Sequence, residues 1–339
     1  MGEGRVTAAD VARLAGVSQS AVSRVFTPGA SASKATADKV RAAAETLGYR
    51  PNVLARSLIT GRTRMIGLVV AYLDNQFYPV AIERLSRALQ ARGYHVLVFM
   101  AEDDTRGVAE VIAELLDHQV EGIVTASVAI SNDITNRCEA AGIPVVMFNR
   151  GQDDPRLSEV TSDNLAGGRA VAEFLLAGGP DRIAHIAGWQ GASTGRARAR
   201  GFLDGLAAAG RAAVEVADGL FRREVAAEAA RRMFGCRGRP DAVFVGGDNM
   251  AFAVMDVLRH ELDLAVPGEV SVVGYDDVPM AAWPAYDLTT VRQPVGAMVD
   301  AAVDTLLARI EGDTAPRKIR VPAPLVVRGS ARIPEGFPR

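Results

Sequence analysis

Hydrophobic and polar positions follow two different periods along this chain of 339 residues. In the first 50 residues, apolar side chains recur at spacings of three and four, which is typical of amphipathic helices. From Met65 onward, short apolar runs of buried-strand type alternate with helix-periodic stretches of roughly 10 to 16 residues, which favours parallel α/β units. The predicted strands are MIGLVVAY, HVLVFMA, GIVTAS, VVMFN, RIAHIAG, AVFVGG and SVVGYDD.

The first predicted helix begins with a capping signal. Thr7 and Asp10 are spaced as in a capping box, which satisfies backbone groups at the start of a helix. Val11 and Leu14 then share one face. Gly16 follows the last helical residue, where glycine favours a stop.

Two more short helices follow. Ser18 caps the second, in which Val22, Val25 and Phe26 face inward, and the third runs over residues 33–48, from Ser33 to Gly48. The polar residues left outside on the second helix are Gln19, Ser20, Ser23 and Arg24.

Two short helices joined by a three-residue turn that contains glycine are typical of a helix-turn-helix. The second helix would present glutamine and arginine, which pair with base edges in the major groove of DNA. A small three-helix bundle with a solvated polar face is the alternative that the spacing leaves open.

The stretch YRPNVLARSLITG, residues 49–61, predicts a helix of two turns that begins at Pro51 and ends before Gly61. A helix this short is marginal in water by itself, because nucleation fixes several dihedral angles for one hydrogen bond. Leu54 and Leu58 lie one turn apart on one face. Either a partner completes this helix or the stretch is a surface turn.

The formal net charge of −2 is unevenly distributed. Residues 1–64 hold ten basic and four acidic side chains, a net charge of +6, so the remainder carries −8. A basic head on an acidic body predicts a polyanion as the partner of the head.

Membrane and secreted proteins are disfavoured. No apolar run approaches the roughly 18 residues of a membrane span, and charges interrupt the first residues where a signal peptide needs an apolar stretch. Cys138 and Cys236 are far apart in apolar surroundings, which predicts reduced core thiols. We therefore expect a cytoplasmic protein that does not contact a membrane.

The motifs of common enzyme classes are missing from the sequence. Lys34, Lys39 and Lys318 are the only lysines, which excludes a P-loop, and no G-x-S-x-G occurs. The four histidines lack metal-ligand spacing, and AGWQGASTG does not fit a dinucleotide fingerprint. We expect no enzymatic activity, no metal and no cofactor.

The segments VTAADVARLAGVSQSAVSRVF and ASKATADKVRAAAETLGYRPNVLARSL closely resemble the DNA-binding head of the lactose-repressor (LacI/GalR) family of bacterial transcription regulators. Two positions depart from the family pattern, because Ala21 stands where many members have threonine and Thr27 where asparagine is usual. The resemblance implies base contacts by Gln19, Ser20 and Arg24 and phosphate contacts by Thr7, Ser18, Ser23, Ser33, Thr36 and Asn52.

The resemblance also implies a role for the short helix at residues 51–59. In family members the equivalent segment is a hinge helix that folds on operator DNA, pairs with its twin and inserts a leucine into the minor groove. Leu58 matches that leucine. An apolar wedge between base pairs unstacks them and bends the duplex, so DNA would complete the helix.

The body resembles the two-lobed effector domain that this family shares with periplasmic sugar-binding proteins. The expected fold is an α/β, periplasmic-binding-protein-like domain of two parallel, doubly wound sheets behind a small all-α helix-turn-helix domain. SEVTSDNLAGG interrupts the strand and helix rhythm and is taken as the boundary between lobes. The implied domains are 1–50 (headpiece), 51–64 (hinge helix and linker) and 65–339 (effector-binding and dimerisation domain), with lobe 1 at 65–161 and 292–321 and lobe 2 at 162–291 and 322–332.

In the same resemblance the chain crosses between lobes near Thr161, Val291 and Pro322. A closing helix with Val295 and Ile310 at its ends returns to lobe 1, and IRVPAPLVVRGS spans both lobes. Nothing after Arg332 resembles the leucine-heptad tail of tetrameric relatives, so a homodimer is expected.

Seven residues are predicted to bind an effector between the lobes. Phe77 and Tyr78 follow the first strand, where aromatic faces suit the apolar side of a ring, although Tyr78 is also in register with a packing face. Arg198 and Asp276 match family positions that hold ligand hydroxyls, with an interlobe ion pair as the alternative. The full set is Phe77, Tyr78, Asn149, Arg198, Phe221, Asp276 and Trp283, and packing is the alternative for Trp283.

Three further positions qualify this site. Asp163 and Asp248 each begin a predicted helix, so both are interpreted as N-caps. Gly247 stands where some sugar-binding members have asparagine, and Asn149 where relatives often have aspartate. The departure at Gly247 removes one possible ligand contact and weakens a specific assignment to a galactoside.

The sequence therefore predicts a homodimeric transcriptional repressor that binds double-stranded operator DNA under the control of a small, sugar-like effector. The alternative is a solute-binding module of periplasmic-binding-protein type without a regulatory role.

Overall fold

The computed structural model of the chain describes residues 6–27, 30–50, 62–71, 73–101, 105–128 and 130–337. It divides into two compact units, Met1–Arg64 and Met65–Arg339.

Over its described residues, the first unit forms helices α1 (Ala8–Ala15), α2 (Gln19–Val25) and α3 (Lys34–Leu47). Thr7 and Asp10 form the predicted capping box, with the Thr7 backbone N–H donating to the Asp10 carboxylate at 3.0 Å. The hydroxyls of Ser18 and Ser33 cap the other two helices, and Gly48 ends α3 at a φ of +64°, where glycine costs least. The boundaries predicted for these three helices are confirmed, while the short helix predicted at residues 51–59 lies outside the described residues.

The core of this unit is small and made mostly of valine and alanine. Val11, Val22 and Val40 are fully buried, and Val25 and Phe26 pack against them as predicted. The expectation that Leu14 shares the buried face is wrong, because its side chain is 53% exposed. The residues of α1 that pack inward are Ala8, Val11, Ala12 and Ala15, and a residue at position 14 lies roughly 100° from the centre of that stripe.

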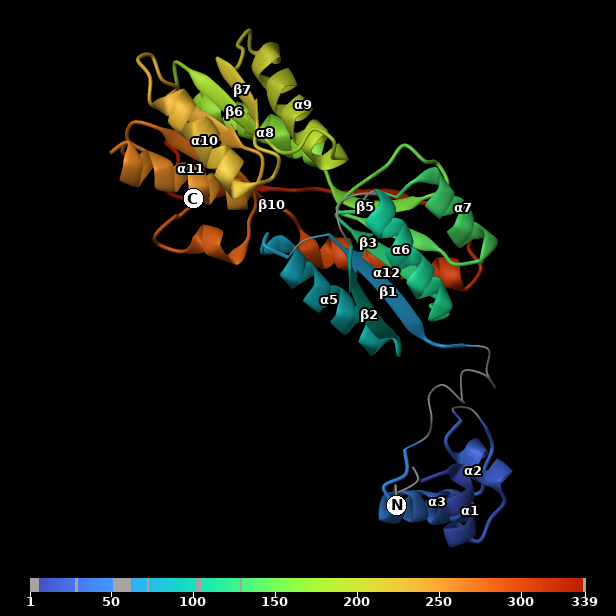
Figure 1. The fold of residues 1–339 in the computed structure, drawn as a ribbon. Helices are drawn as coiled ribbons and strands as arrows, with labels where there is room; N and C mark the ends of the chain where they lie inside the picture. Colours follow the sequence, from blue (N-terminus) through green and yellow to red (C-terminus); the bar gives the residue numbers. More distant parts are fainter. Residues whose placement is uncertain are drawn as a thin grey trace. The chain divides into compact units, whose positions relative to one another are not determined.

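The second unit is built on two six-stranded sheets with the same pattern of strand order (Figure 1). Sheet 1 has the order β11-β5-β4-β3-β1-β2 and is parallel throughout. Its strands are β1 (Met65–Val70), β2 (His95–Met100), β3 (Gly122–Ala126), β4 (Val145–Phe148), β5 (Ser158–Ser162) and β11 (Lys318–Val321).

Sheet 2 has the order β12-β10-β9-β8-β6-β7, in which only the β10 and β12 pair is antiparallel. Its strands are β6 (Ile183–Ala187), β7 (Glu215–Asp218), β8 (Ala242–Val245), β9 (Ser271–Asp276), β10 (Thr289–Arg292) and β12 (Leu325–Val326).

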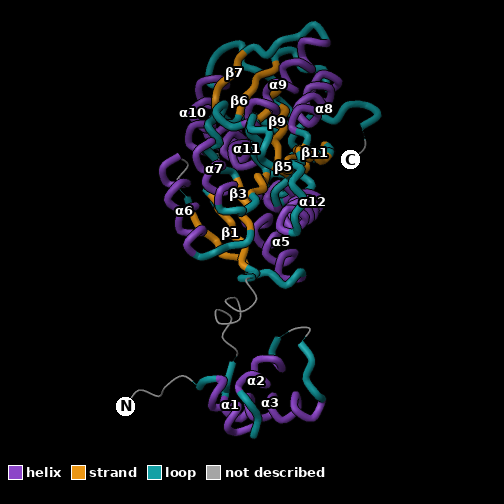
Figure 2. Tube along the Cα trace, turned by 90° about the vertical axis from the view of Figure 1, so that its right-hand side faces the viewer, coloured by secondary structure: helices purple, strands orange, loops and turns teal. Residues whose placement is uncertain are grey.

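Helices cover both faces of each sheet, as expected for doubly wound folds (Figure 2). In lobe 1, α12 packs on β3, β4 and β5 beside α5, while α6 packs with α7. In lobe 2, α8 pairs with α9, and α10 pairs with α11. The helices are α5 (Phe77–Ala91), α6 (Thr105–Asp117), α7 (Asn132–Ala140), α8 (Asn164–Ala177), α9 (Ser193–Ala208), α10 (Arg223–Phe234), α11 (Asp248–Asp256), η1 (Val257–Glu261), η2 (Pro279–Ala282) and α12 (Val295–Ile310). The predicted two-lobed α/β fold is confirmed.

The chain passes between the sheets three times. It leaves sheet 1 after β5 and enters α8, leaves sheet 2 after β10 and enters α12, and runs from β11 in sheet 1 to β12 in sheet 2. The segment SEVTSDNLAGG does not interrupt the rhythm as expected, because it holds β5 and the start of α8. The strand β5 was not predicted because its serines and threonine are polar, although all of its residues but one are buried.

The two cysteines differ. Cys138 is buried in lobe 1, and burial raises the pKa of its thiol to about 11. Cys236 is exposed, so the prediction of a core thiol is wrong there. In the described part of the chain, every helix is too short or too polar to cross a bilayer.

Candidate functional site

The polar residues of α2 form one exposed surface. Gln19 and Ser23 are four residues apart, as are Ser20 and Arg24, so the four side chains lie on neighbouring rows of the helix. The Ser18 hydroxyl accepts from the Ala21 backbone at 3.2 Å and shares a hydrogen bond with Ser20 at 2.9 Å. The surface therefore offers an amide, hydroxyls and a guanidinium from a single capped helix.

The residues predicted to touch phosphates lie mostly at helix N-termini. Thr7 and Ser33 are N-caps, and the Ser33 hydroxyl also pairs with the Thr36 hydroxyl at 2.8 Å. Backbone N–H groups at such positions attract anions. Asn52 and Leu58 lie outside the described residues.

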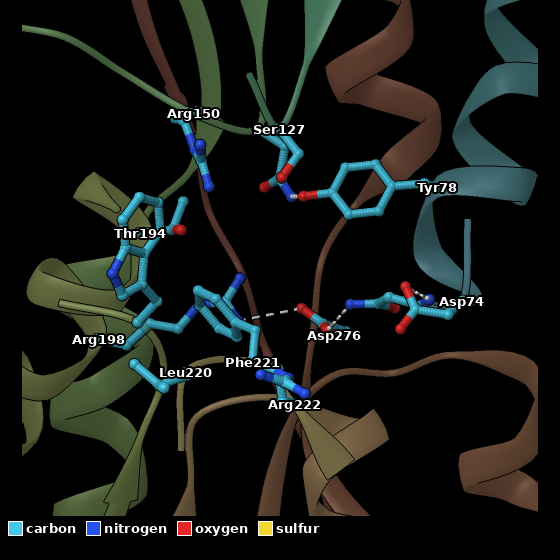
Figure 3. A pocket seen from close by; sticks show the side chains of 13 residues that line it. Asp74, Tyr78, Ser127, Arg150, Thr194, Arg198, Leu220, Phe221, Arg222 and Asp276 are labelled. Carbon is cyan, nitrogen blue, oxygen red and sulfur yellow. Dashed lines mark hydrogen bonds and ion pairs between the residues drawn. The ribbon is translucent and has the colours of Figure 1, made fainter. Parts of the chain in front are cut away.

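A cavity of about 420 Å³ separates the two lobes at the carboxyl ends of their strands (Figure 3). Its volume lies within the range of about 300 to 1,000 Å³ that is usual for small-molecule sites. The lining residues are Asp74, Asn75, Tyr78, Ser127, Asn149, Arg150, Trp189, Thr194, Arg198, Leu220, Phe221, Arg222 and Asp276.

A buried ion pair lies on the lobe 2 side of the cavity. Arg198, on α9, and Asp276, at the end of β9, approach to 3.2 Å and are both 3% exposed in their side chains. The Arg198 guanidinium also lies over the Tyr275 ring at 3.7 Å. Because both residues belong to lobe 2, the alternative of an interlobe ion pair is wrong.

This ion pair is hydrogen-bonded to two of the three crossing segments. Arg198 Nε donates to Asn164 Oδ1 at 2.8 Å, just after the first crossing. Gln293, at the second crossing, donates to Asp276 Oδ1 at 2.7 Å. The Ser162 hydroxyl donates to Gln293 Oε1 at 2.9 Å and so joins the two crossings. A ligand that moves the pair therefore acts on the connections between the lobes.

Burial raises the pKa of Asp276 above its ordinary value, although Arg198 opposes the rise. From lobe 1, Asn75 Nδ2 donates to Asp276 Oδ2 at 3.2 Å across the cavity. The carboxylate is thus held by donors from both lobes and remains part of the lining.

Asp248 does not cap α11, so that prediction is wrong. Gly247 is the N-cap residue, and the fully buried Asp248 accepts from the Val278 backbone at 2.9 Å and from the Thr290 hydroxyl of β10 at 2.6 Å. Desolvation, followed by the charge of Asp276, raises the pKa of Asp248 to about 7. The prediction for Asp163 is confirmed, since its side chain accepts from the Ala166 backbone at 3.0 Å.

Lobe 1 contributes an amide, a phenol and a guanidinium. Asn149, after β4, donates through Nδ2 to the Tyr78 hydroxyl at 3.2 Å. Its other polar atom, Oδ1, is buried and has no hydrogen-bond partner among the described residues. The next residue, Arg150, is 4% exposed, and its guanidinium lies 5.4 Å from the centre of the Trp189 ring.

Strained backbone conformations gather around the cavity. Five lining residues other than glycine have a positive φ, a conformation that costs energy and is often found at functional sites. These residues are Ser127 (65°), Asn149 (58°), Leu220 (54°), Phe221 (56°) and Asp276 (128°).

Two of the seven predicted effector residues do not line the cavity. Phe77 is buried in the core, where its ring stacks on Phe148 at 6.3 Å between centroids. Trp283, which follows η2, is 53% exposed outside the cavity. Tyr78 combines the two roles weighed for it, because its ring belongs to the core and the residue also lines the cavity.

Sequence reasoning missed several polar residues around the cavity. Ser127 and Arg150 each follow a strand of sheet 1, so the rule that ligands bind beyond the carboxyl ends of parallel strands identifies both. Asn75 was also missed, although it lies only two residues before Phe77, which was predicted to bind the effector. Gln293 was not predicted, because the segment near Val291 was treated only as a crossing between lobes and β10, which ends one residue before Gln293, was not identified.

The chain matches two family models. Residues 7–52 match bacterial regulatory proteins of the lacI family, and residues 172–331 match a periplasmic binding protein-like domain. The ribose operon repressor of Escherichia coli (strain K12) is 33% identical over 334 residues, which cover 96% of this chain and 99% of the relative.

Two solved structures are similar over nearly the whole chain. The lac repressor dimer bound to operator and the anti-inducer ONPF has a TM-score of 0.88 at 27% identity, over 96% of this chain and 99% of that chain. The complex of the transcriptional regulator CelR with cellobiose has a TM-score of 0.73 at 32% identity, over 96% of this chain and 100% of that chain.

Proposed function

Since the chain belongs to the lacI family of bacterial regulatory proteins, we propose that it is a homodimeric repressor of transcription whose affinity for operator DNA is set by a sugar-like effector. The repressors among its relatives support a regulatory role in place of an enzymatic one. Two hydrogen bonds carry the proposal, one that Arg198 donates to Asn164 and one that Asp276 accepts from Gln293, because they link the cavity to the segments that move when two lobes close.

On DNA, α2 enters the major groove of each half-site. Gln19, Ser20 and Arg24 meet base edges, while Thr7 and Ser33 lie at helix N-termini suited to phosphate. The remaining proposed phosphate contacts are Ser18, Ser23, Thr36 and Asn52. Leu58 of each protomer is the wedge at the centre of the operator, as the family resemblance implies.

In the cavity, Arg198 and Asp276 bind neighbouring hydroxyls of the effector, because a guanidinium donates and a carboxylate accepts. Asn149, Tyr78 and Phe221 complete the proposed site. The relatives named for ribose and cellobiose support a sugar-like ligand. An effector with different affinities for the open and closed lobes shifts the equilibrium between them and so changes operator binding.

A second copy of the chain is proposed to cover the edge strand β2. Val98 and Met100 lie on one face of this strand and are 49% and 50% exposed. An edge strand with exposed apolar side chains is a common pairing surface. The similarity to a solved repressor dimer supports the same assembly.

Operator binding tests the proposal. DNA sites selected from a randomised pool should be roughly palindromic, and their affinity, measured by fluorescence anisotropy, should fall steeply with salt concentration. Arg24→Ala should lower the affinity by about 10-fold or more, since one good base contact is worth about 1–3 kcal/mol. The matched control is Arg41→Ala, which removes an exposed arginine from α3. Equal affinities for the two variants, or no selected site at all, would contradict the proposal.

A further inference from the structure

We infer that Asp277 is a positioning residue, which couples the effector cavity to the connections between the lobes without touching the effector. Its carboxylate anchors the second and third crossings to the turn that carries Asp276. It thereby determines how strongly the cavity and the DNA-binding head respond to each other. The inference rests on the proposed function, since it concerns the regulation of the same cavity, and it gives a role to a residue that does not line that cavity.

Asp277 directly follows Asp276 at the end of β9, and its side chain is 7% exposed. The φ of Asp276 is 128° and that of Asp277 is 55°, so two consecutive residues other than glycine form a strained turn. Asp276 extends into the cavity (Figure 3), whereas Asp277 is not among the lining residues. The two neighbouring carboxylates of one turn therefore have different surroundings.

Two arginines from the crossing segments hold the Asp277 carboxylate. Arg292, the last residue of β10 before the second crossing, donates through Nε to Oδ2 at 2.5 Å. Arg328, two residues after β12 at the end of the third crossing, donates through Nη2 to Oδ1 at 2.7 Å. Each carboxylate oxygen thus receives a charged donor from a different crossing, and such hydrogen bonds are stronger than neutral ones.

The two bonds differ in how far water screens them. The Arg328 side chain is 15% exposed and that of Arg292 is 53% exposed. Because exposed ion pairs contribute little, the bond to Arg328 is the stronger anchor. The two arginines lie 51 and 15 residues from Asp277 in the sequence, so these bonds connect distant segments and do not serve the local turn alone.

The backbone joins the same two crossings. β10 and β12 pair antiparallel, and the Arg292 backbone N–H donates to the Pro324 carbonyl at 2.8 Å. The adjacent Gln293 donates its side-chain amide to Asp276 in the cavity. The second crossing is therefore bonded to the cavity carboxylate on one side and to the third crossing on the other.

This arrangement gives a displacement of the cavity turn a direct route to both crossings. Asp276 and Asp277 share a planar peptide bond, so a movement of one residue moves the other. The second crossing continues into α12 of lobe 1, and the third comes from β11 of lobe 1. Without the Asp277 carboxylate, Arg292 and Arg328 lose their shared counter-charge, and the turn is able to move while the crossings stay in place.

Operator DNA serves as the probe, because coupling between two binding sites is reciprocal. Trp189 of lobe 2 lines the cavity and lies 5.4 Å from the Arg150 guanidinium of lobe 1, so a movement between the lobes changes its surroundings. Trp189 and Trp283 are the only tryptophans of the chain, and Trp283→Phe therefore leaves a single reporter. The quenching of its emission by iodide is measured on the full-length protein with and without an operator selected from the randomised pool.

In the Trp283→Phe protein, operator binding should change the quenching of Trp189. Asp277→Asn in this background keeps the shape of the side chain and tolerates the positive φ, but it removes the charge. The variant should still bind operator, because its head is unchanged. The operator-induced change in quenching should fall about twofold or more.

Two further variants separate coupling from stability. Arg328→Gln breaks the same ion pair from the third crossing and should reduce the response in the same way. Asp241→Asn is the control, because this carboxylate pairs with Arg332 at 3.8 Å and lies at the amino end of β8, away from the cavity. It should keep the full response of Trp189, whatever stability it loses in urea unfolding.

Three results would overturn the inference. An unchanged response in both Asp277→Asn and Arg328→Gln, or an equal loss in Asp241→Asn, would give Asp277 a structural role only. An operator that binds the Trp283→Phe protein without affecting Trp189 would show that the cavity and the head are not coupled, while the DNA-binding part of the proposed function remains. Absence of operator binding would remove the repressor and the inference together, and fluorescence anisotropy reports this separately from the Trp189 signal.

Discussion

The two lobes share one strand order but place different chemistry at the cavity. In sheet 1 and sheet 2 the strands follow the same sequence of crossovers, and the cavity lies beyond the carboxyl ends of both. Lobe 2 presents a buried ion pair, Arg198 and Asp276, which is also hydrogen-bonded to Asn164 and Gln293. Lobe 1 presents Asn149, whose side-chain oxygen is a buried acceptor with no hydrogen-bond partner in the described part of the chain.

The two lobes therefore offer a ligand different groups, although their sheets have the same strand order. Because Arg198 and Asp276 are already held in position, little of the free energy of ligand binding is lost in ordering them. Lobe 1 offers a hydrogen-bonding atom that only a ligand or water can satisfy. In the proposed function, a ligand completes lobe 1 against a preformed lobe 2, and the two crossings that are hydrogen-bonded to the ion pair connect the site to both lobes.

The largest effect is expected from breaking the ion pair of lobe 2. Arg198→Ala leaves Asp276 buried with its main counter-charge removed, which should lower the free energy of unfolding by about 3–5 kcal/mol. Affinity for the effector should fall with it. Urea unfolding and calorimetry measure the two effects, and Arg198→Lys, which keeps the charge, should recover part of the stability. Full stability in Arg198→Ala would show that the pair does not organise lobe 2.

A second prediction concerns pH and the buried carboxyl of Asp248. Its pKa is raised from 3.8 to about 7, so across this window the folded state holds a proton that the unfolded state has lost. The stabilisation from this group is therefore lost as the pH rises from about 4 to about 7, by up to about 1.4 kcal/mol per pH unit. Asp248→Asn should remove this loss.

The fully buried His185 makes stability depend on pH in the opposite direction. Its pKa is lowered from 6.5 to about 4, so its contribution to stability is lost as the pH falls through that window. Urea unfolding of wild type and Asp248→Asn from about pH 4 to about pH 7 isolates the Asp248 contribution, since both proteins keep His185. The stability of the variant relative to wild type should increase with pH. A difference that does not change with pH would refute the raised pKa.

The smallest effect is expected in lobe 1. Tyr78→Phe removes the hydroxyl that accepts from Asn149 and keeps the ring in the core, so the free energy of unfolding should fall by about 1 kcal/mol. Affinity for the effector should fall several-fold, because Asn149 loses its orientation. Phe77→Leu is a useful comparison, since Phe77 is a core residue that does not line the cavity. A larger loss of affinity in Phe77→Leu than in Tyr78→Phe would reverse the assignment of the two rings.

Local sequence signals predicted most of the fold. Thr7, Ser18 and Ser33 mark helix starts because a capping side chain acts within three residues. Several buried strands were visible as apolar runs, whereas β5 was not, because Ser158, Thr161 and Ser162 are polar although they are buried.

The site was predicted less completely, for reasons that lie in tertiary structure. Asn149, Arg198, Phe221 and Asp276 were found through the family resemblance. Nothing local distinguishes Phe77 from Tyr78, whose side chains diverge only once α5 packs on Phe148. Asp248 was expected as a cap because it begins a helix, but the partners that hold it come from Val278 and Thr290, distant in sequence.

The chain enters lobe 1 at Met65, the amino end of β1, while the cavity lies beyond the carboxyl end of the sheet. Six residues of extended strand separate the two, a span of about 20 Å at roughly 3.3 Å per residue. If lobe 1 rotates about the crossings when a ligand binds, as the proposed function requires, its sheet moves as one rigid body. A tilt of the sheet by a few degrees then displaces Met65 by about one ångström. The strands stay folded during this movement.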